Sequence, residues 1–175
     1  MFDFRLCLNK PTVCRFMFRV TDGELFMVLE RRKATETDKQ FLRQLFTRVY
    51  EEVVVRQIGH WDDQAYDKYF EDSWPGNNYE LIESNGEILA AMWVEYEHDH
   101  IWLREIQVCP EHQNKGIGSR LLRQLMEDAD ASGLPIRLRV LRRSRALPLY
   151  EKVGFARDGE YKDSHFWMAY QPANK

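Results

Sequence analysis

The sequence has no long apolar run, few cysteines and no large surplus of either charge. No stretch approaches the roughly 18 consecutive apolar residues of a transmembrane helix. The 3 cysteines, Cys7, Cys14 and Cys109, form an odd and sparse set that favours a reducing compartment over a disulfide framework. A formal net charge of −3 gives no electrostatic reason to expect a nucleic-acid partner. We therefore expect a soluble cytoplasmic protein with neither a nucleic-acid nor a membrane partner.

Residues 1–28 have a pattern of their own. Apolar side chains alternate near residues 2–8 and 16–20, and the Asp-Gly pair at 22–23 is a hairpin signal, which together predict a small β-meander. Charged residues within the first ten positions make this stretch a poor signal peptide. Two interpretations stay open. The segment is either a β-extension of the main domain, expected at 29–175, or the result of an upstream translation start, with Met17 or Met27 as the natural one.

From residue 28 onward, strand and helix patterns follow one another. A Thr35–Asp38 pair resembles a capping box at the start of the first helix, and glycines at 133 and 154 are expected to end two others. This order predicts an α+β fold with a mixed sheet and no internal domain boundary after residue 29. We predict strands over 28–33, 79–84, 87–97, 100–108, 135–141, 155–161 and 165–171, and helices from 35 to about 50 and over 62–74, 116–131 and 144–153.

The strand at 100–108 changes its parity midway. Ile101 and Leu103 share one face, whereas Ile106 and Val108 have the opposite parity. Because side chains alternate strictly along a strand, both pairs reach one face only if an extra residue lies between them. We therefore predict a β-bulge near Arg104–Glu105, with burial of the strand on both faces as the alternative.

Two glycines occur where a strand pattern changes into a helix pattern, in the stretch EHQNKGIGSR at 111–120. A helix start exposes unpaired N–H groups, and residues without Cβ atoms let an anion touch them. The known phosphate loops do not fit: Leu121 stands where a dinucleotide motif has its third glycine, and Lys115 precedes Gly116 instead of following it. The two interpretations at this point are an anion cradle and a tight strand-to-helix turn.

The longer stretch VCPEHQNKGIGSRLLRQL resembles the acetyl-CoA signature of the GNAT superfamily of N-acetyltransferases, a Gln/Arg-x-x-Gly-x-Gly/Ala loop after a bulged strand. Gln113, Gly116 and Gly118 match it. Downstream, ALPLYEKVGF at 146–155 resembles the superfamily's second signature. The stretches RKATETD and GHWDDQAY resemble bacterial members with broad or undefined substrates. The resemblance covers residues 29 to about 170 and implies a GNAT-like fold: a twisted, mostly antiparallel sheet with a splayed, bulged pair of central strands and flanking helices.

The resemblance implies acetyl-CoA as a cosubstrate and no metal. Its pantetheine arm would pair with the bulged strand like an added strand. Two departures from the family pattern lie near the second signature: Arg143 stands where an Asn often contacts coenzyme A, and Pro148 falls inside the short helix. The implied cofactor-binding residues are Ile106, Gln107 and Val108 for the arm, Gln113, Asn114, Lys115, Gly116, Ile117 and Gly118 for the diphosphate, and Ser119 and Arg143 nearby.

The same resemblance implies transfer of an acetyl group to a primary amine by direct attack on the thioester. Tyr150 matches the family's general acid, and Glu105 lies where the family often has a carboxylate base. Other candidates for the base are Glu95, Glu97, His98 and His100. The segment between the first two predicted helices would form the acceptor wall, and its aromatic and acidic character favours a cationic amine; its candidate residues are Tyr50, Glu51, Glu52, His60 and Trp61.

Several alternatives stay open. The chain could be a catalytically silent acyl-CoA-binding module of the same fold, or a metal protein that uses His98 and His100, although we favour a polar hairpin turn there. Cys109 is interpreted as a packing residue rather than a nucleophile. Edge strands at both ends of the sheet would permit a homodimer. The acceptor is a small molecule or a peptide amine. A basic run is expected either to meet coenzyme A or an acidic substrate, or to be a solvated face; it comprises Arg137, Arg139, Arg142, Arg143 and Arg145.

Overall fold

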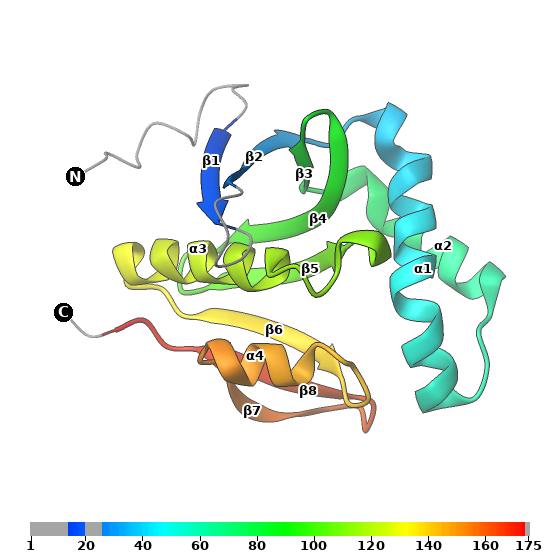
Figure 1. Cartoon of the computed structure of the whole chain (residues 1–175). Coiled ribbons are helices and arrows are strands. Elements are labelled where there is room, and N and C mark those ends of the chain that lie inside the picture. The colour runs from blue at the N-terminus through cyan, green and yellow to red at the C-terminus, as the bar shows by residue number, and fades with distance from the viewer. Residues whose placement is uncertain (1–13, 20–25, 174–175) are drawn as a thin grey trace.

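A computed structural model describes residues 14–19 and 26–173, and these form one mixed α/β sheet structure with helices on both faces (Figure 1). The sheet order is β1-β2-β3-β4-β5-β6-β8-β7, and every neighbouring pair is antiparallel except β5 and β6. The strands are β1 (Cys14–Arg19), β2 (Phe26–Lys33), β3 (Tyr79–Ser84), β4 (Glu87–Tyr96), β5 (Ile101–Val108), β6 (Ile136–Leu141), β7 (Ala156–Tyr161) and β8 (His165–Tyr170). The helices are α1 (Lys39–Ile58), α2 (Asp63–Ser73), α3 (Ile117–Ser132) and α4 (Leu147–Val153).

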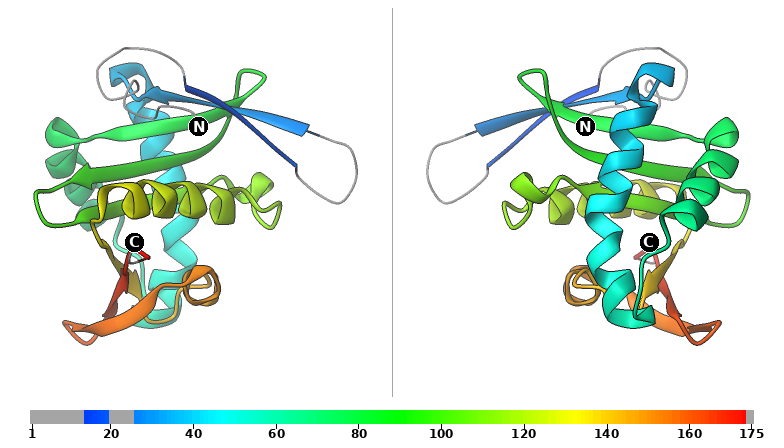
Figure 2. Two further views of the ribbon diagram at one scale, coloured as in Figure 1. Left: turned by 90° about the vertical axis from the view of Figure 1, so that its left-hand side faces the viewer. Right: turned by 90° about the vertical axis from the view of Figure 1, so that its right-hand side faces the viewer.

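Each face of the sheet has its own apolar core, and Figure 2 shows α1 and α3 on opposite sides of the molecule. The first core contains the apolar stripe of α3, the inner side of α4 and side chains from β2 to β6 and β8. The second contains residues of α1 and α2 packed on β3 and β4. Both faces of the central strands are therefore covered, which explains their nearly continuous apolar sequences.

The predicted bulge in β5 is confirmed. Glu105 pairs with Trp93 while Leu103 pairs with Val94, so that Arg104 is the extra residue. As a result, Ile101, Leu103, Ile106 and Val108 all pack with the α3 core, and the side chain of Gln107 is turned to the other face with Glu105. The bulge thus decides which side chains reach each face.

The strands β5 and β6 separate soon after they meet. Their parallel pairing covers only Ile101–Leu103 against Ile136–Leu138, after which β5 continues beside β4 and β6 continues beside β8. The expected splayed pair of central strands is therefore present. Beyond Leu103, no described strand pairs with the edge of β5 that faces away from β4. At the end of this edge, the Val108 carbonyl accepts a hydrogen bond from the side-chain amide of Gln113 at 3.0 Å.

The predicted elements are confirmed, with one clear difference at α1. The pattern predicted a helix to about residue 50, whereas α1 continues to Ile58 and ends at Gly59, whose φ is 100°. The β-branched run Val53–Val55 lowers the intrinsic helix preference, yet Val53 and Val54 are buried, and this burial favours the helix. Pro148 is also less disruptive than expected, because it lies in the first turn of α4, where N–H groups have no helical partner anyway.

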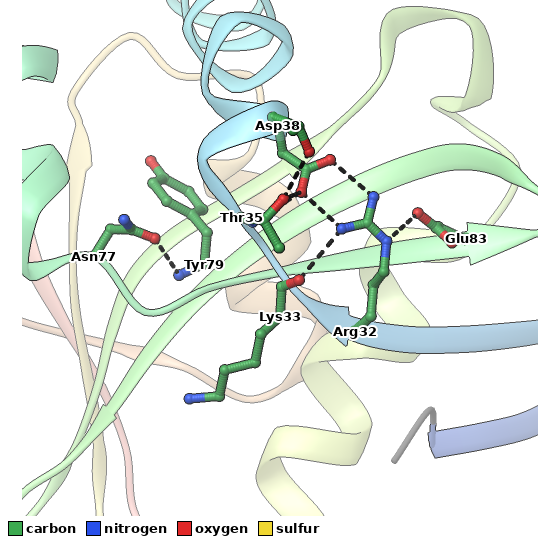
Figure 3. A network of polar contacts seen from close by, with 8 residues as sticks. Arg32, Lys33, Thr35, Asp38, Asn77, Tyr79 and Glu83 are labelled. Atoms are coloured by element: carbon green, nitrogen blue, oxygen red, sulfur yellow. Dashed lines mark hydrogen bonds and ion pairs between the residues drawn. The ribbon is translucent and has the colours of Figure 1, made fainter. Parts of the chain in front are cut away.

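A charged network ties the start of α1 to the sheet (Figure 3). Arg32 of β2 donates to both carboxylate oxygens of Asp38, at 2.7 and 2.8 Å, and its Nε donates to Glu83 of β3 at 2.7 Å. Asp38 also accepts the backbone N–H of Thr35, as in the predicted capping box. The neighbouring Arg32 guanidinium lowers the pKa of Asp38 to about 2. This network fixes the angle at which α1 leaves the sheet.

The predicted division between residues 28 and 29 falls inside β2, which begins at Phe26. β1 pairs with β2 in antiparallel register, so that residues 14–19 belong to the same sheet as the rest. The alternating pattern near residues 2–8 and the turn signal at 22–23 lie outside the described residues. Among the described residues, no helix is long and apolar enough to span a membrane.

Candidate active site

The glycine loop leads from β5 into α3. Asn114 and Gly116 both have positive φ values, 59° and 82°, which turn the chain sharply before the helix. The first backbone bond of α3 runs from the Arg120 N–H to the Gly116 carbonyl, so the N–H groups of residues 117–119 have no partner within the helix. These N–H groups, together with the positive end of the helix dipole, are suited to an anion.

Gly118 separates the two interpretations of this loop. A Cβ atom added there would lie 3.5 Å from Leu149 Cδ2 and 3.7 Å from Val108 Cγ2, which is ordinary van der Waals contact. Its φ does not fall in the left-handed region that favours glycine. Neither packing nor backbone conformation therefore requires a glycine at 118, and a close ligand is a sufficient reason for one. The residues present fit the diphosphate of coenzyme A.

The side chains of the loop take different positions. Gln113 is bound to the Val108 carbonyl, so its amide holds the loop against the end of β5. Lys115 is exposed beside the helix start, and Ile117 is buried under it. The Nε atom of Arg120 is buried without a hydrogen-bond partner among the described residues. The donors that this loop offers to an anion are therefore mainly its backbone N–H groups.

Glu105 lies at the centre of a polar cluster on the α1 side of the sheet. Its Oε2 atom accepts hydrogen bonds from the Tyr50 hydroxyl and from Gln107 Nε2, the latter at 3.2 Å. No described residue bonds to its Oε1 atom. Burial raises the pKa of Glu105, against the opposing effects of Tyr50, Gln107 and Arg139. A carboxylate with a raised pKa and one free oxygen is a competent proton acceptor.

Tyr150 approaches the same place from α4. It is 7% exposed, its ring meets Phe155 edge to face at 5.8 Å, and no described residue hydrogen-bonds to its hydroxyl. Burial, followed by the charge of Glu105, raises the pKa of this phenol. The pKa of the Tyr50 phenol is also raised, mainly by burial, then by Glu105 and by Tyr150. The charge of Glu105 therefore acts on Tyr50 and on Tyr150, the second predicted catalytic residue.

The polar cluster around Glu105 also contains Tyr79 and the side chain of Gln107, neither of which was predicted there from the sequence. Tyr79 of β3 is 4% exposed, and its pKa is raised by burial and by the charge of Glu105. Gln107 was predicted for its backbone, but its side chain is completely buried and its Oε1 atom has no partner among the described residues. Only the alternation around the bulge could have indicated that Gln107 and Glu105 share a face.

The expected acceptor wall is only partly assembled. Tyr50 and Glu51 lie within α1 rather than between the first two helices, because α1 is longer than predicted. Tyr50 and Trp61 flank Phe46, at ring distances of 4.7 and 6.5 Å, whereas Glu51 is exposed on the outer side of the helix. Glu52 is bound to Arg56 and Arg145. Of the two carboxylates that favoured a cationic amine, Glu51 therefore faces the solvent and Glu52 is paired with arginines.

The basic run does not form one patch. Arg142 pairs with Glu160 at 2.7 Å, and Arg145 pairs with Glu52 at 2.6 Å. Arg143 donates to the Arg56 carbonyl at 2.7 Å, and its backbone N–H donates to the Gln57 side chain at 3.1 Å, so it ties the loop after β6 to the end of α1. Its predicted contact with coenzyme A stays a prediction.

The alternative sites differ from this cluster. The sequence His98-Asp99-His100 forms a turn between β4 and β5, as favoured, and its carboxylate lies next to both imidazoles. No group of three or more potential metal ligands occurs within the part of the chain that the structure describes. Cys109 is 3% exposed within the second core, and burial raises the pKa of its thiol, which agrees with a packing role.

Comparison with known proteins agrees with this geometry. The model of the acetyltransferase (GNAT) family matches residues 40–155, more than half of the chain. The chain therefore belongs to the GNAT acetyltransferase family. The comparison with curated protein sequences found no match.

Solved structures share the fold at low sequence identity. The PaiA N-acetyltransferase of Thermoplasma acidophilum, solved with coenzyme A, is 18% identical with a TM-score of 0.63, over 82% of this chain and 98% of that one. The ribosomal-protein-S18-alanine N-acetyltransferase of Escherichia coli is 19% identical with a TM-score of 0.59, over 84% and 96% of the two chains. A protein of Pyrococcus horikoshii is 18% identical with a TM-score of 0.65, over 83% and 99%. At this identity the likeness shows the fold alone.

Proposed function

We propose that this protein is an acetyl-CoA-dependent N-acetyltransferase that acts on a primary amine by direct attack on the thioester. One observation carries the proposal. Where β5 and β6 separate, the buried Glu105 accepts hydrogen bonds from Tyr50 and Gln107, and its charge raises the pKa of Tyr150 of α4; at the end of the same strand, the glycine loop leads into α3, whose N–H groups at 117–119 have no helical partner. A relative of the same fold was solved with coenzyme A, which supports this cosubstrate.

The loop residues 113–119 would hold the diphosphate through their backbone N–H groups, and the unpaired edge of β5 would hold the pantetheine arm. Bound acetyl-CoA would supply the acetyl group as an activated thioester. An unpaired N–H of β5 near the bulge would stabilise negative charge on the carbonyl oxygen. These are contributions of the backbone, so they depend on the turn and on the splay rather than on particular side chains.

The side chains would move the protons. An amine must lose its ammonium proton before it attacks, and Glu105 would accept that proton at Oε1, while Tyr50 and Gln107 hold its other oxygen. Tyr150 would give its phenolic proton to the sulfur as the carbon–sulfur bond breaks and the amide forms. The attacking nitrogen would lose its second proton at this stage, which restores the Tyr150 phenol, and Glu105 would release its proton to solvent. Because the pKa of Tyr150 is raised, the phenol stays protonated and ready to donate at neutral pH.

The first test measures thermal unfolding with and without acetyl-CoA, followed by thiol release with a library of amines. We expect acetyl-CoA at about 100 times its Kd to stabilise the fold by about 2.7 kcal/mol. Replacement of Tyr150 by Phe should keep this stabilisation and lower kcat about 100-fold. No stabilisation of a folded wild-type sample would contradict the proposal, and stabilisation without thiol release would favour the silent acyl-CoA-binding module.

A further inference from the structure

Arg139 lies on the same face of the sheet as Glu105. Ile136, Leu138 and Val140 of β6 are buried in the α3 core, so the alternate residues Arg137 and Arg139 point to the opposite face, where both are exposed. The bulge turns Glu105 to that face on the neighbouring strand. The proposed base, Glu105, and the exposed guanidinium of Arg139 thus lie on the same face of the sheet, where β5 and β6 separate.

Three aromatic rings surround the guanidinium of Arg139. Its Cζ atom lies 6.0 Å from the ring centre of Trp102, 4.9 Å from that of Tyr161 and 5.7 Å from that of Trp167. The rings also hold one another edge to face, since Trp167 is 5.3 Å from Trp102 and 5.4 Å from Tyr161. Strands β5, β7 and β8 therefore contribute to one aromatic cage, which restricts the position of the charge without neutralising it.

Arg139 differs in its partners from the arginines around it. Arg104 pairs with Glu95 at 2.7 Å, Arg142 with Glu160 at 2.7 Å and Arg157 with Glu151 at 3.0 Å. Across residues 14–19 and 26–173, no carboxylate forms an ion pair or a hydrogen bond with Arg139. A guanidinium fixed by rings and left without an anion is suited to an anion from outside the chain.

The charge of Arg139 acts on Glu105 without a direct contact between the two side chains. The two groups form no ion pair, yet the charge of Arg139 counteracts the effect of burial on the pKa of Glu105. It also acts on the pKa values of Tyr69 and His165, which border the same face. An acidic and a basic side chain on one face of the sheet are suited to a small molecule that carries both a positive and a negative group.

We propose that Arg139 binds the carboxylate of the acceptor, and that the acceptor is a free amino acid whose amine lies at Glu105. This inference rests on the proposed function and narrows it. A planar guanidinium fork matches a carboxylate in two-point contact, so an amino acid would be held at both ends. A protein lysine or the N-terminus of a peptide amide lacks the nearby carboxylate, and both should be poor acceptors.

The test compares matched acceptors in the thiol-release assay with saturating acetyl-CoA. Each free amino acid of the standard set is paired with its amide and with the amine that lacks the carboxylate, and O-phosphoethanolamine provides a phosphate in place of the carboxylate. We expect at least one free amino acid to exceed both of its partners in kcat/KM by about 10- to 100-fold, the range of a charge-assisted hydrogen bond. The difference should lie mainly in KM.

The variant Arg139→Gln should remove this preference, lowering kcat/KM for the amino acid about 10- to 100-fold. At a pH well above the pKa of Glu105, where the missing charge does not change its protonation, kcat/KM for the matched amine should stay unchanged. Arg137→Gln is the matched control, because Arg137 is exposed on the same face of the same strand but lies outside the cage. It should behave as wild type. Binding of the preferred amino acid to the coenzyme A-loaded protein, measured by calorimetry, gives a readout that does not depend on turnover.

The outcomes separate this inference from the proposed function. Acetylation of plain amines at rates equal to those of the amino acids, unchanged in Arg139→Gln, would overturn the inference and leave the acetyltransferase standing. A preference for O-phosphoethanolamine would likewise overturn the carboxylate in favour of a phosphate. If the loaded protein bound no amino acid more tightly than its matched amine, the inference would also be wrong, even for a protein without turnover. Absence of acetyl-CoA binding would contradict the proposed function itself.

Discussion

The two sides of the proposed site are built in different ways. The anion-binding side is one continuous segment, residues 113–119, and its donors are backbone N–H groups at the start of α3. The acceptor side is assembled from side chains of α1, α4, β5, β6, β7 and β8. The first depends on a turn and the absence of a Cβ atom. The second depends on a bulge, a splay and the way that distant elements pack.

This difference predicts different responses to mutation. A backbone cradle is lost only when something is added to it, so substitutions of exposed side chains such as Lys115 should matter little. A cluster of side chains is lost when a single member is removed, because the remaining polar groups are then buried without partners. Three substitutions test the comparison, ordered by their expected effect on the reaction.

The largest effect is expected for Glu105→Gln. It removes the proposed base, keeps the shape of the side chain, and should lower kcat about 100- to 1,000-fold with acetyl-CoA binding unchanged. In the wild type, activity should rise with pH as Glu105 loses its proton. Because burial raises its pKa, this rise should lie above the ordinary value of 4.5. Steady-state kinetics from pH 4 to 9, roughly the range that such profiles need, would check both points.

The competing carboxylate provides the contrast for this experiment. Glu97 lies in the turn between β4 and β5, and its replacement by Gln should leave the rate and the pH profile unchanged. If Glu97→Gln lowered kcat and Glu105→Gln did not, the base would have to be reassigned and the acceptor side would not be centred on the bulge.

A smaller effect is expected for Gly118→Ala, on the other side of the comparison. The added Cβ meets only ordinary contacts within the protein, so the melting temperature should stay the same or rise slightly. It would, however, occupy the space of an anion on the N–H groups, and the Kd for acetyl-CoA should rise roughly tenfold to 100-fold. Calorimetric titration with acetyl-CoA measures this directly.

Gly76→Ala is a suitable control for this loop, because Gly76 also has room for a Cβ and no left-handed φ, and it lies outside the loop. The melting temperature of Gly76→Ala and its Kd for acetyl-CoA should both match those of the wild type. An unchanged affinity in Gly118→Ala would mean that the glycine serves only the turn, and the cradle interpretation would be abandoned.

The smallest effect on the reaction is expected for Asp38→Asn, which lies outside both sides of the site. It breaks the paired contact with Arg32 (Figure 3) and should lower the free energy of unfolding by about 2 kcal/mol, with kcat unchanged at temperatures where the protein is folded. Chemical denaturation at neutral pH measures the change. The exposed pair of Asp72 with Lys68 gives the control, since Asp72→Asn should cost less than about 0.5 kcal/mol.

The lowered pKa of the Asp38 carboxylate also predicts how the free energy of unfolding changes at acidic pH. The pKa of Asp38 is lowered from 3.8 to about 2, so its stabilising effect is complete above pH 3.8 and is lost as the pH falls towards 2. The difference in stability between wild type and Asp38→Asn should therefore shrink over that interval. A difference that stayed constant down to pH 2 would show that the contact contributes through shape and not through charge.

The sequence predicted more of the first side than of the second. For the first side, the turn into α3 and the apolar stripe of this helix are local patterns, and both were confirmed in the fold. For the second side, only the parity change in β5 is a local pattern, and it was confirmed as a bulge. The length of α1 was underestimated, because the burial of Val53 and Val54 outweighs their weak helix preference. The acidic wall expected from Glu51 and Glu52 did not form, since the direction of a side chain on a helix depends on where the helix ends and how it packs.

The sequence alone determined the order of the elements, the bulge and the glycine loop, because these depend on alternation, turn residues and missing Cβ atoms within a few positions. Only the tertiary structure decided that Glu105 accepts a hydrogen bond from Tyr50 and acts on the pKa of Tyr150, and that Arg139 lies within rings from three other strands. Those residues are separated by tens of positions along the chain. Their meeting is fixed by the register of the sheet and the splay of β5 from β6, which no local pattern contains.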